Sequence, residues 1–254
     1  MNKAANAKII QVTAGNIEET GFFCYMSKRK SEGFQRKLVW LKARLAEGLR
    51  IKMFELPERG FIEYIPGEYA WRSVNAKGYM VIHCLWVVGK SKGRGLGGIL
   101  VQECLRDARE SGLKGVAMVT SRRNWLSGKG LLLKHGFETV AEAPPFELLV
   151  KRFGRVPAPT FSDDWERKTA RFGRGLTVIR SDQCPYLPDA TDLVLEFAKK
   201  RGLPSRIVEL KSSRDVRKLS PSPYGTFSIV YDGRLLAYHY LLPKDLERLL
   251  PETG

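Results

Sequence analysis

The chain has 254 residues, 43% of them hydrophobic, which is enough for one large or two ordinary-sized domains with packed cores. Lysine and arginine outnumber aspartate and glutamate by 43 to 27, giving a formal net charge of +16. This charge favours an anionic partner, either a phosphate-bearing cofactor or a nucleic acid. Because basic and acidic residues are interspersed rather than collected in a tail, we favour the cofactor and expect no nucleic-acid partner.

Residues 1–7 are polar and lack the apolar region of a signal peptide. No window approaches the ~20 apolar residues of a membrane helix. The cysteines are far apart, without a Cys-x-x-Cys pair, and with three histidines they predict neither a disulfide framework nor a metal site. We therefore expect a reduced, cytoplasmic protein with no metal and no membrane partner. The cysteines are Cys24, Cys84, Cys104 and Cys184.

The first seventy residues alternate short apolar runs with two helical patterns. Asn16 is the candidate N-cap of the first helix, and Gly48 ends the second. The turn sequence Pro57-Glu58-Arg59-Gly60 separates two strands. We expect, in order, a strand at 8–12, a helix beginning at 16 and continuing through 22–28, a helix at 32–47, and strands at 50–56 and 60–65, the second of which resumes at 69–74.

Residues 79–111 contain the most informative pattern of the chain. Residues 79–88 are apolar, with many β-branched and aromatic side chains, and predict a buried strand. A polar segment follows, and then Gly95-Leu96-Gly97-Gly98 opens a helical pattern. A strand, a glycine-bearing loop and a helix N-terminus form a candidate phosphate site, because the first N–H groups of a helix have no partner within it. The alternative is an ordinary connection with solvated lysines.

Further along, the pattern predicts a strand at 115–120, a short helix at 131–134 ended by His135-Gly136, and a hairpin of 137–141 with 146–153. Together, the elements expected up to residue 153 follow the order β-α-α-β-β-β-loop-α-β-α-β-β.

The loop Lys92-Gly93-Arg94-Gly95-Leu96-Gly97 resembles the pyrophosphate loop of GNAT-superfamily N-acetyltransferases, Gln/Arg-x-x-Gly-x-Gly/Ala. Lys92 replaces the usual Gln or Arg and keeps a positive charge. Val87 stands where that family closes its fourth strand, and Lys134-His135-Gly136-Phe137 resembles the end of its fourth helix. Walker A and dinucleotide fingerprints fit worse, because their glycine spacings are absent.

The resemblance implies a mixed central sheet with flanking helices and acetyl-CoA (coenzyme A) as cofactor. Its pantetheine arm would pair with the fourth strand, and its pyrophosphate would sit on the loop. The implied coenzyme-binding residues are Leu85, Trp86, Val87, Lys92, Gly93, Arg94, Gly95, Leu96, Gly97, Gly98 and Asn124.

The catalytic side chains depart from the family. Leu132 occupies the position of the tyrosine that protonates the coenzyme thiolate in many members, so Ser127, Lys129 or water would have to replace it. His83 stands where many members have a glutamate base, and Glu63 on the neighbouring strand is the other candidate. The alternatives are a core histidine satisfied by a neighbour and a solvent-facing glutamate. We expect Cys84 to point to the opposite face, into the core.

The composition changes at residue 155, where Val156-Pro157-Ala158-Pro159 predicts a linker. Beyond it we expect a helix at 163–171, a strand at 176–180, a helix at 190–200, a strand at 207–210, a hairpin of 226–231 with 235–240 across Asp232-Gly233, and a helix at 244–250.

This second half resembles a small thioredoxin-like domain. Cys184-Pro185-Tyr186 stands where glutaredoxin-like proteins carry Cys-Pro-Tyr-Cys, but Leu187 replaces the second cysteine. Pro223 would be the cis-proline facing Cys184. A thiolate before a helix is stabilised, so Cys184 is a candidate reactive thiol, and a scaffold or docking role is the alternative. The combination resembles YoaP-like acetyltransferases over nearly the whole chain.

We therefore expect an α/β (α+β) protein with a GNAT domain at 1–154, a linker with a short helix at 155–172, and a thioredoxin-like domain at 173–254. The expected function is acetyl transfer from acetyl-CoA to a primary amine of a small molecule or peptide by direct attack in a ternary complex. A ping-pong route through Cys84 is weakly motivated. The rivals are a thiol-dependent protein acting through Cys184 and a basic nucleic-acid- or ribosome-associated binding module. A homodimer is compatible with the sequence.

Overall fold

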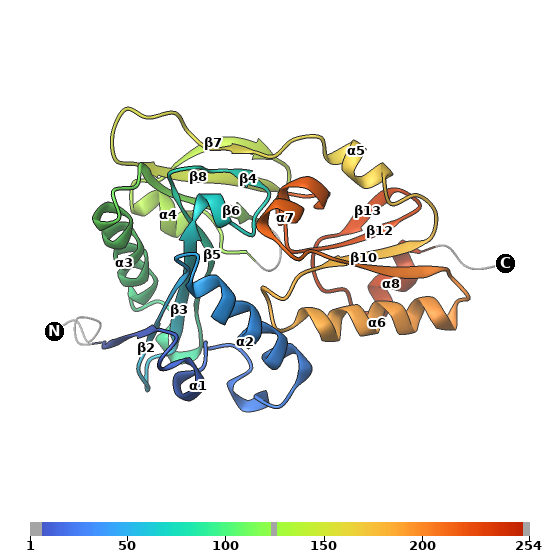
Figure 1. Ribbon diagram of the computed structural model, residues 1–254, viewed down its shortest axis with the longest axis horizontal. Coiled ribbons are helices and arrows are strands. Elements are labelled where there is room, and N and C mark those ends of the chain that lie inside the picture. Colours follow the sequence, from blue (N-terminus) through green and yellow to red (C-terminus); the bar gives the residue numbers. More distant parts are fainter. Residues whose placement is uncertain (1–6, 123–125, 251–254) are drawn as a thin grey trace. The chain divides into compact units, whose positions relative to one another are not determined.

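A computed structural model describes residues 7–122 and 126–250. The chain divides into two compact units that interleave along the sequence (Figure 1). The first contains Met1–Ser27, Leu41–Ala70 and Val74–Phe161. The second contains Ser162–Gly254 together with two segments of the N-terminal half, Lys28–Trp40 and Trp71–Ser73. None of the helices in the described ranges is long and apolar enough to cross a membrane.

The first unit is built on a seven-stranded mixed sheet of order β1-β2-β3-β5-β6-β8-β7. Neighbouring strands are antiparallel except β5 and β6, which are parallel. The strands are β1 (Ile9–Val12), β2 (Arg50–Phe54), β3 (Gly60–Pro66), β5 (Met80–Val87), β6 (Gly115–Ser121), β7 (Glu138–Ala143) and β8 (Phe146–Arg152).

Helix α3 (Leu96–Glu110) covers one face of this sheet, in contact with β3, β5 and β6 (Figure 1). Its apolar stripe includes Leu100, Val101, Cys104 and Leu105, all with at most 2% of their surface exposed. These side chains share a core with β3, β5 and β6, as expected for the i, i+3, i+4 spacing of the sequence. The remaining helical elements with residues in this unit are α1 (Ile17–Thr20), part of α2 (Glu32–Leu45), α4 (Gly130–Lys134) and the 3₁₀ turns Met26–Lys28, Gly67–Tyr69 and Gly89–Ser91.

A buried ionic network joins α3 to β2 and β3. The Nζ of Lys52 lies 2.7 Å from Asp107 Oδ1 and 2.9 Å from Glu103 Oε2. The Tyr64 hydroxyl donates to Asp107 Oδ2 at 2.6 Å, and Arg50 Nη1 lies 2.9 Å from the same oxygen. Burial alone would raise the pKa of Asp107, but hydrogen bonds from Lys52, Tyr64 and Arg50 hold it below its usual value.

The parallel pair β5–β6 separates partway along its length. Its register couples Met80–Ile82 with Val116–Met118 and stops there, although β5 continues to Val87 and β6 to Ser121. On its other edge β5 stays paired with β3 to Val87, with a bulge at His83, because Glu63 pairs with Cys84 and Tyr64 with Ile82. One edge of residues 83–87 therefore faces the opening between β5 and β6.

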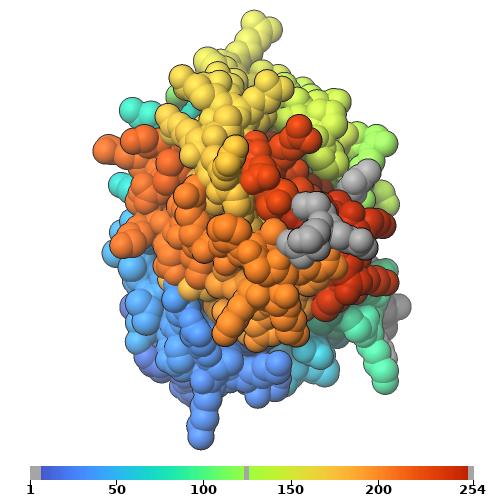
Figure 2. All heavy atoms as spheres, turned by 90° about the vertical axis from the view of Figure 1, so that its right-hand side faces the viewer, coloured from blue at the N-terminus to red at the C-terminus, as the bar shows by residue number. Residues whose placement is uncertain are grey.

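The second unit contains a four-stranded sheet of order β11-β10-β12-β13. Strands β10 and β11 are parallel and joined through α6, whereas β10–β12 and β12–β13 are antiparallel. Apart from one additional helix between β11 and β12, the element order is the one expected from the sequence. Figure 2 shows the closely packed yellow-to-red side chains of this unit. Its elements are α5 (Trp165–Ala170), β10 (Leu176–Arg180), α6 (Leu187–Lys200), β11 (Ser205–Glu209), α7 (Ser213–Leu219), β12 (Phe227–Tyr231), β13 (Arg234–Ala237) and α8 (Pro243–Leu249).

Three local predictions were wrong. The first helix does not continue through 22–28, since Gly21, Phe23 and Tyr25 all have positive φ, which ends helical geometry. The strand expected at 69–74 is instead a short β4 (Val74–Asn75) paired with β9 (Thr160–Phe161). Helix α7 was missed, although Ser212 caps it by accepting from the Asp215 amide at 3.1 Å.

Candidate functional site

The loop between β5 and α3 has the backbone that its glycines require. Gly89, Gly93 and Gly95 have φ of +60°, +75° and +79°, a region that residues with a Cβ rarely adopt. A Cβ at any of them would meet no atom within 4 Å, so the loop is open on these sides. Gly95 is the N-cap of α3 and contributes no side-chain oxygen to its first N–H groups. The first turn of α3 therefore presents its N–H groups at an open, positively polarised end.

Glu58, in the turn between β2 and β3, holds this loop in place. Arg94 Nη1 lies 2.6 Å and 2.7 Å from the two Glu58 carboxylate oxygens. The Ser91 hydroxyl donates to Glu58 Oε2 at 2.8 Å and accepts from the Arg59 amide at 2.9 Å. The bonds from Ser91 and Arg94 lower the pKa of Glu58. Arg94 thus anchors the loop, while Lys92 is exposed and its side chain makes no hydrogen bond or ion pair with the residues that the structure describes.

The next two glycines are needed for packing. A Cβ on Gly97 would lie 3.0 Å from Leu131 Cδ2, and one on Gly98 would lie 2.8 Å from His135 Nε2. Both neighbours come from α4 or its C-cap. Larger residues here would push α4 away from α3, so the glycine run sets the close approach of the two helices as well as the shape of the loop.

Ser127 lies at the free edge of β5. Its hydroxyl donates to the Leu85 carbonyl at 2.8 Å, within the strand segment expected to pair with a pantetheine arm. Trp86 is 46% exposed and Val87 is half-buried. Asn124, the remaining predicted coenzyme contact, lies outside the described residues.

His83 and Glu63 form one buried pair. His83 Nδ1 lies 3.1 Å from Glu63 Oε1, and the two residues are 0% and 1% exposed. The alternative of a solvent-facing Glu63 is therefore wrong, whereas the alternative of a core histidine satisfied by a neighbour agrees with this contact. The sequence patterns predicted His83 and Glu63 as two alternative bases. Their contact makes them one hydrogen-bonded pair rather than two separate candidates.

The face of β3 and β5 turned away from α3 is aromatic. Ile62 and Leu85, which pair across the strands, belong to the α3-facing core, so their neighbours Phe61 and Trp86 point to the other face. The Phe23 ring stacks on Phe61, with centroids 4.7 Å apart and an interplanar angle of 26°. Phe23 reaches this position with a φ of +80°. Sequence reasoning missed this aromatic face, whose signal was the Phe22-Phe23 doublet after Gly21.

Cys84 lies on the same face as Trp86 and pairs with Glu63. It is half-buried and outside the α3-facing core, so its predicted core position was wrong. Leu132 is fully buried in that core, at the position where the resemblance would place an acidic hydroxyl. Lys129, the other alternative donor, lies 2.8 Å from Glu147 Oε1 in an ion pair.

Cys184 belongs to the second unit, in the turn before α6. It is half-buried, and its carbonyl accepts from the Leu187 amide at 3.2 Å. The prediction of a cis bond before Pro223 was wrong, since the described cis peptide bonds precede Pro57 and Pro145. The carbonyl of Pro223 instead accepts from the Ser73 amide at 3.4 Å.

The N-terminal half of α2 packs against the turn that carries Cys184. A Cβ on Gly33 would lie 1.9 Å from the Pro185 carbonyl oxygen. Arg36 Nε lies 2.7 Å from Asp182 Oδ1, and its Nη2 lies 2.8 Å from Glu209 Oε1. Helix α2 therefore fixes the backbone around Cys184.

Comparisons with known proteins agree on one family. A family model described as the acetyltransferase (GNAT) family matches residues 30–137. The chain is 32% identical over 248 residues to an uncharacterized N-acetyltransferase, YoaP, of Bacillus subtilis strain 168, covering 95% of this chain and 97% of that protein.

Solved structures give more distant likenesses. A ribosomal-protein-alanine N-acetyltransferase of Brucella melitensis has 16% identity and a TM-score of 0.43, covering 57% of this chain and 99% of that one. A PaiA N-acetyltransferase of Thermoplasma acidophilum, solved in complex with coenzyme A, has 14% identity and a TM-score of 0.41, covering 58% and 99%.

Proposed function

Because the chain belongs to the GNAT family of acetyltransferases, we propose that it moves the acetyl group of acetyl-CoA to a primary amine of a small molecule or peptide. The observation that carries this proposal is the divergence of β5 from β6 beyond Ile82, with β5 leading directly into the glycine loop of α3. Acetyl-CoA has an extended arm with a thioester at one end and a pyrophosphate at the other. This shape matches a free strand edge followed by a helix N-terminus that can bind an anion.

In this proposal the coenzyme lies along β5 and onto the loop. The pyrophosphate accepts hydrogen bonds from N–H groups at the start of α3, and Lys92 adds positive charge. The pantetheine arm follows the free edge of Leu85–Val87. Ser127 lies on this edge through its bond to the Leu85 carbonyl, so it would border the arm near the reacting sulfur.

Acetyl transfer requires a neutral amine. The amine nitrogen attacks the thioester carbon, the tetrahedral intermediate expels the coenzyme thiolate, and the amine proton leaves to a base. We assign the base to the His83–Glu63 pair, which takes the proton through water because both side chains are buried. The thiolate takes a proton from water, either directly or through the Ser127 hydroxyl, which passes its proton on and regains one from that water, and a main-chain N–H of β5 holds the oxyanion.

The aromatic face supports an acceptor class. Trp86 and the partly exposed Phe23, which stacks on the buried Phe61, offer flat apolar surface on the same face as Glu63. Such a wall favours amines attached to an apolar or aromatic group, because apolar surface gains about 25 cal/mol per Å² when it leaves water. We therefore propose aromatic and large aliphatic amines as better acceptors than small polar ones.

Calorimetry with acetyl-CoA tests the first half of the proposal, and free-thiol release over an amine panel tests the second. We expect saturable binding of acetyl-CoA and faster thiol release with phenethylamine than with ethanolamine. Absence of coenzyme binding would contradict the proposal as a whole. Equal rates with both amines would contradict only the acceptor class.

A further inference from the structure

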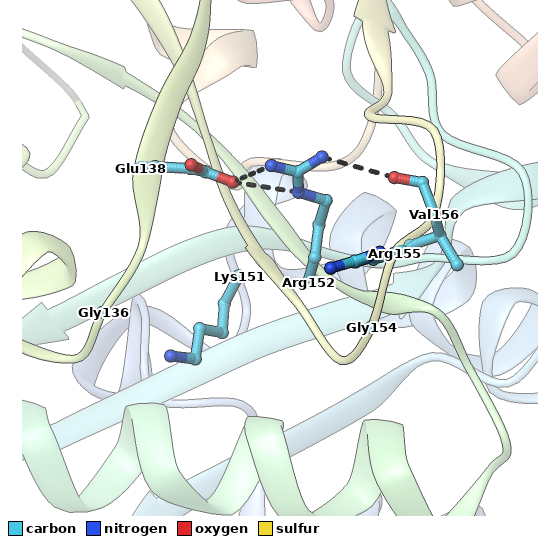
Figure 3. Close-up of a pocket in the computed structure, with 7 residues that line it drawn as sticks. All are labelled: Gly136, Glu138, Lys151, Arg152, Gly154, Arg155 and Val156. Carbon is cyan, nitrogen blue, oxygen red and sulfur yellow. Dashed lines mark hydrogen bonds and ion pairs between the residues drawn. The ribbon is translucent and has the colours of Figure 1, made fainter.

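A polar pocket of about 480 Å³ opens in the first unit, at the end of the β7–β8 hairpin (Figure 3). Its walls come from Gly136 in the turn after α4, Glu138 at the start of β7, Lys151 and Arg152 at the end of β8, and residues 154–156 beyond that strand. This volume lies within the roughly 300–1,000 Å³ typical of small-molecule sites.

The pocket lies at the end of the sheet opposite the opening between β5 and β6. In the β6–β8 register, Arg152 faces Gly115 at the start of β6, whereas Phe146 faces Ser121 at its end. Six residues of strand separate these ends by about 20 Å. Since β5 and β6 are parallel and diverge toward their C-terminal ends, the pocket does not belong to the coenzyme site.

The lining is strongly basic. Three cationic side chains and one carboxylate give it a net charge of +2. Glu138 neutralises Arg152. The Nε and Nη2 atoms of Arg152 lie 2.9 Å and 2.6 Å from Glu138 Oε1, and Arg152 Nη1 also donates to the Val156 carbonyl at 3.4 Å. Figure 3 shows Arg152 held between these two acceptors, with Lys151 extending toward Gly136 and Arg155 on the opposite wall.

Lys151 and Arg155 are the two uncompensated cations of the pocket. Neither has a side-chain partner among the residues that the structure describes. Gly136 makes room for one of them: a Cβ there would lie 2.5 Å from Lys151 Nζ. The main-chain N–H groups of Gly154 and Arg155 likewise have no acceptor within the described part of the chain. The pocket therefore offers donors and positive charge, and its one carboxylate is already used.

We propose that this pocket binds the phosphate group of a phosphorylated small molecule, separately from acetyl-CoA. Phosphate oxygens accept from the Lys151 ammonium, the Arg155 guanidinium and the free main-chain amides, and a dianion matches the charge of +2. Charge-assisted bonds of this kind are stronger than neutral ones, and arginine binds phosphate in a bidentate manner. The remaining pocket volume accommodates the rest of the ligand.

Inorganic phosphate is the probe, titrated into the full-length protein at constant ionic strength and followed by residue-resolved amide NMR. Because phosphate also suits the loop before α3, the titration is repeated with saturating coenzyme A. Signals of Gly136 and Gly154 report on the pocket, and those of Gly93 and Gly95 report on the loop. The test variant combines Lys151→Gln and Arg155→Gln. The matched control, Lys199→Gln with Lys200→Gln, removes the same charge from exposed positions of α6.

We expect the Gly136 and Gly154 signals to shift saturably with and without coenzyme A. The pocket variant should raise the Kd measured there at least 10-fold, and the control should change it less than twofold. Linear, non-saturating shifts would overturn the proposal, as would equal losses in both variants, which would indicate a general charge effect. Shifts confined to Gly93 and Gly95 would also overturn it. If the loop does not bind coenzyme A, only the proposed acetyl transfer is contradicted, because the signals of the pocket are measured separately from those of the loop.

Discussion

Glu63 and His83 matter here as a pair rather than as separate candidates. With Nδ1 and Oε1 3.1 Å apart and both side chains buried, replacing the carboxylate with a neutral amide removes the negative charge beside the imidazole. We expect Glu63→Gln to lower kcat by about 10²–10⁴-fold, the usual contribution of a general base. The measurement is the pH dependence of kcat beside the Kd of acetyl-CoA by calorimetry.

His83→Gln provides the matched comparison for that variant. If the two residues act as a unit, each single variant and the double variant should lose similar activity, because the effects of coupled groups are not additive. Coenzyme affinity should stay within about twofold in all three, since neither residue lies on the loop. A wild-type pH–rate profile in Glu63→Gln would remove the pair from the mechanism.

Asp107 is a side chain whose ionisation stabilises the fold. Its carboxylate accepts from Lys52, Tyr64 and Arg50, and these bonds keep its folded pKa below the ordinary value of 3.8 despite burial. A lowered carboxyl pKa gives stability that is fully present above the unfolded pKa and is lost as pH falls through the folded pKa. Asp107→Asn should cost about 3–5 kcal/mol at pH 7, as expected when one partner of a buried ion pair is removed.

Hydrogen exchange of the α3 amides measures this loss locally, which suits a chain with two units. In the wild type the opening free energy should fall as pH drops below about 4, and in Asp107→Asn this acid dependence should be weaker. Glu110→Gln, an exposed change on the same helix, should have an effect within about 0.5 kcal/mol. If the opening free energy depends on pH equally in the wild type and in Asp107→Asn, then a carboxyl group other than Asp107 controls this dependence.

Among the elements, the loop before α3 can be tested by charge reversal without backbone strain. Lys92 is exposed at the open side of the loop and does not take part in the Glu58 anchor. Lys92→Glu places a carboxylate beside the proposed pyrophosphate, so it should raise the Kd of acetyl-CoA at least 10-fold, which is about 1.4 kcal/mol. Lys77→Glu makes the same charge change at an exposed position away from the loop. An equal change in both variants would mean that only overall charge matters.

The loop and α3 were predictable because their signals are local. Glycine spacing identifies the turn, and the spacing of Leu100, Cys104 and Leu105 identifies the buried face of the helix. The His83–Glu63 contact was not predictable, because the two residues are twenty positions apart in the sequence and meet at a bulge in the pairing of β3 with β5. The same holds for the aromatic face, where Phe23 meets Phe61 although α2 and β2 lie between them in the sequence. Local patterns thus located the proposed coenzyme loop but not the partners of the candidate catalytic residues.

For the chain as a whole, the interleaving of the two units is the feature that sequence patterns could not reveal. A composition change at residue 155 predicts a linker there, and in the structure Lys28–Trp40 and Trp71–Ser73 belong to the same unit as Ser162–Gly254. Arg72 shows why: it is 1% exposed, donates to the Tyr224 carbonyl at 3.2 Å and lies over the Tyr224 ring at 5.0 Å. No periodicity in Trp71-Arg72-Ser73 indicates such a partner.

This arrangement predicts that residues 162–254 do not fold stably by themselves. Without Lys28–Trp40 the fragment lacks the contact of Gly33 with Pro185 and the ion pairs of Arg36 with Asp182 and Glu209. The carboxylates of Asp182 and Glu209 then lose a cationic partner, and the surface that α2 covers is exposed to water. We expect the fragment to show little protection in hydrogen exchange at β10 and β12, whereas the full chain protects both strands. A fragment as protected as the full chain would show that the two N-terminal segments contribute nothing to this unit.

Gly33→Ala tests the same dependence inside the full-length protein. The added Cβ would lie 1.9 Å from the Pro185 carbonyl oxygen, a distance that forces the α2 backbone and the Cys184 turn apart. Helix propensity alone would make a glycine-to-alanine change favourable by about 1 kcal/mol, so a loss of protection at β10 must come from the contact. Gly130→Ala, at the start of α4 with no atom within 4 Å of the new Cβ, is the matched control and should be neutral or stabilising. If Gly33→Ala also leaves protection at β10 unchanged, then α2 does not support the turn that carries Cys184.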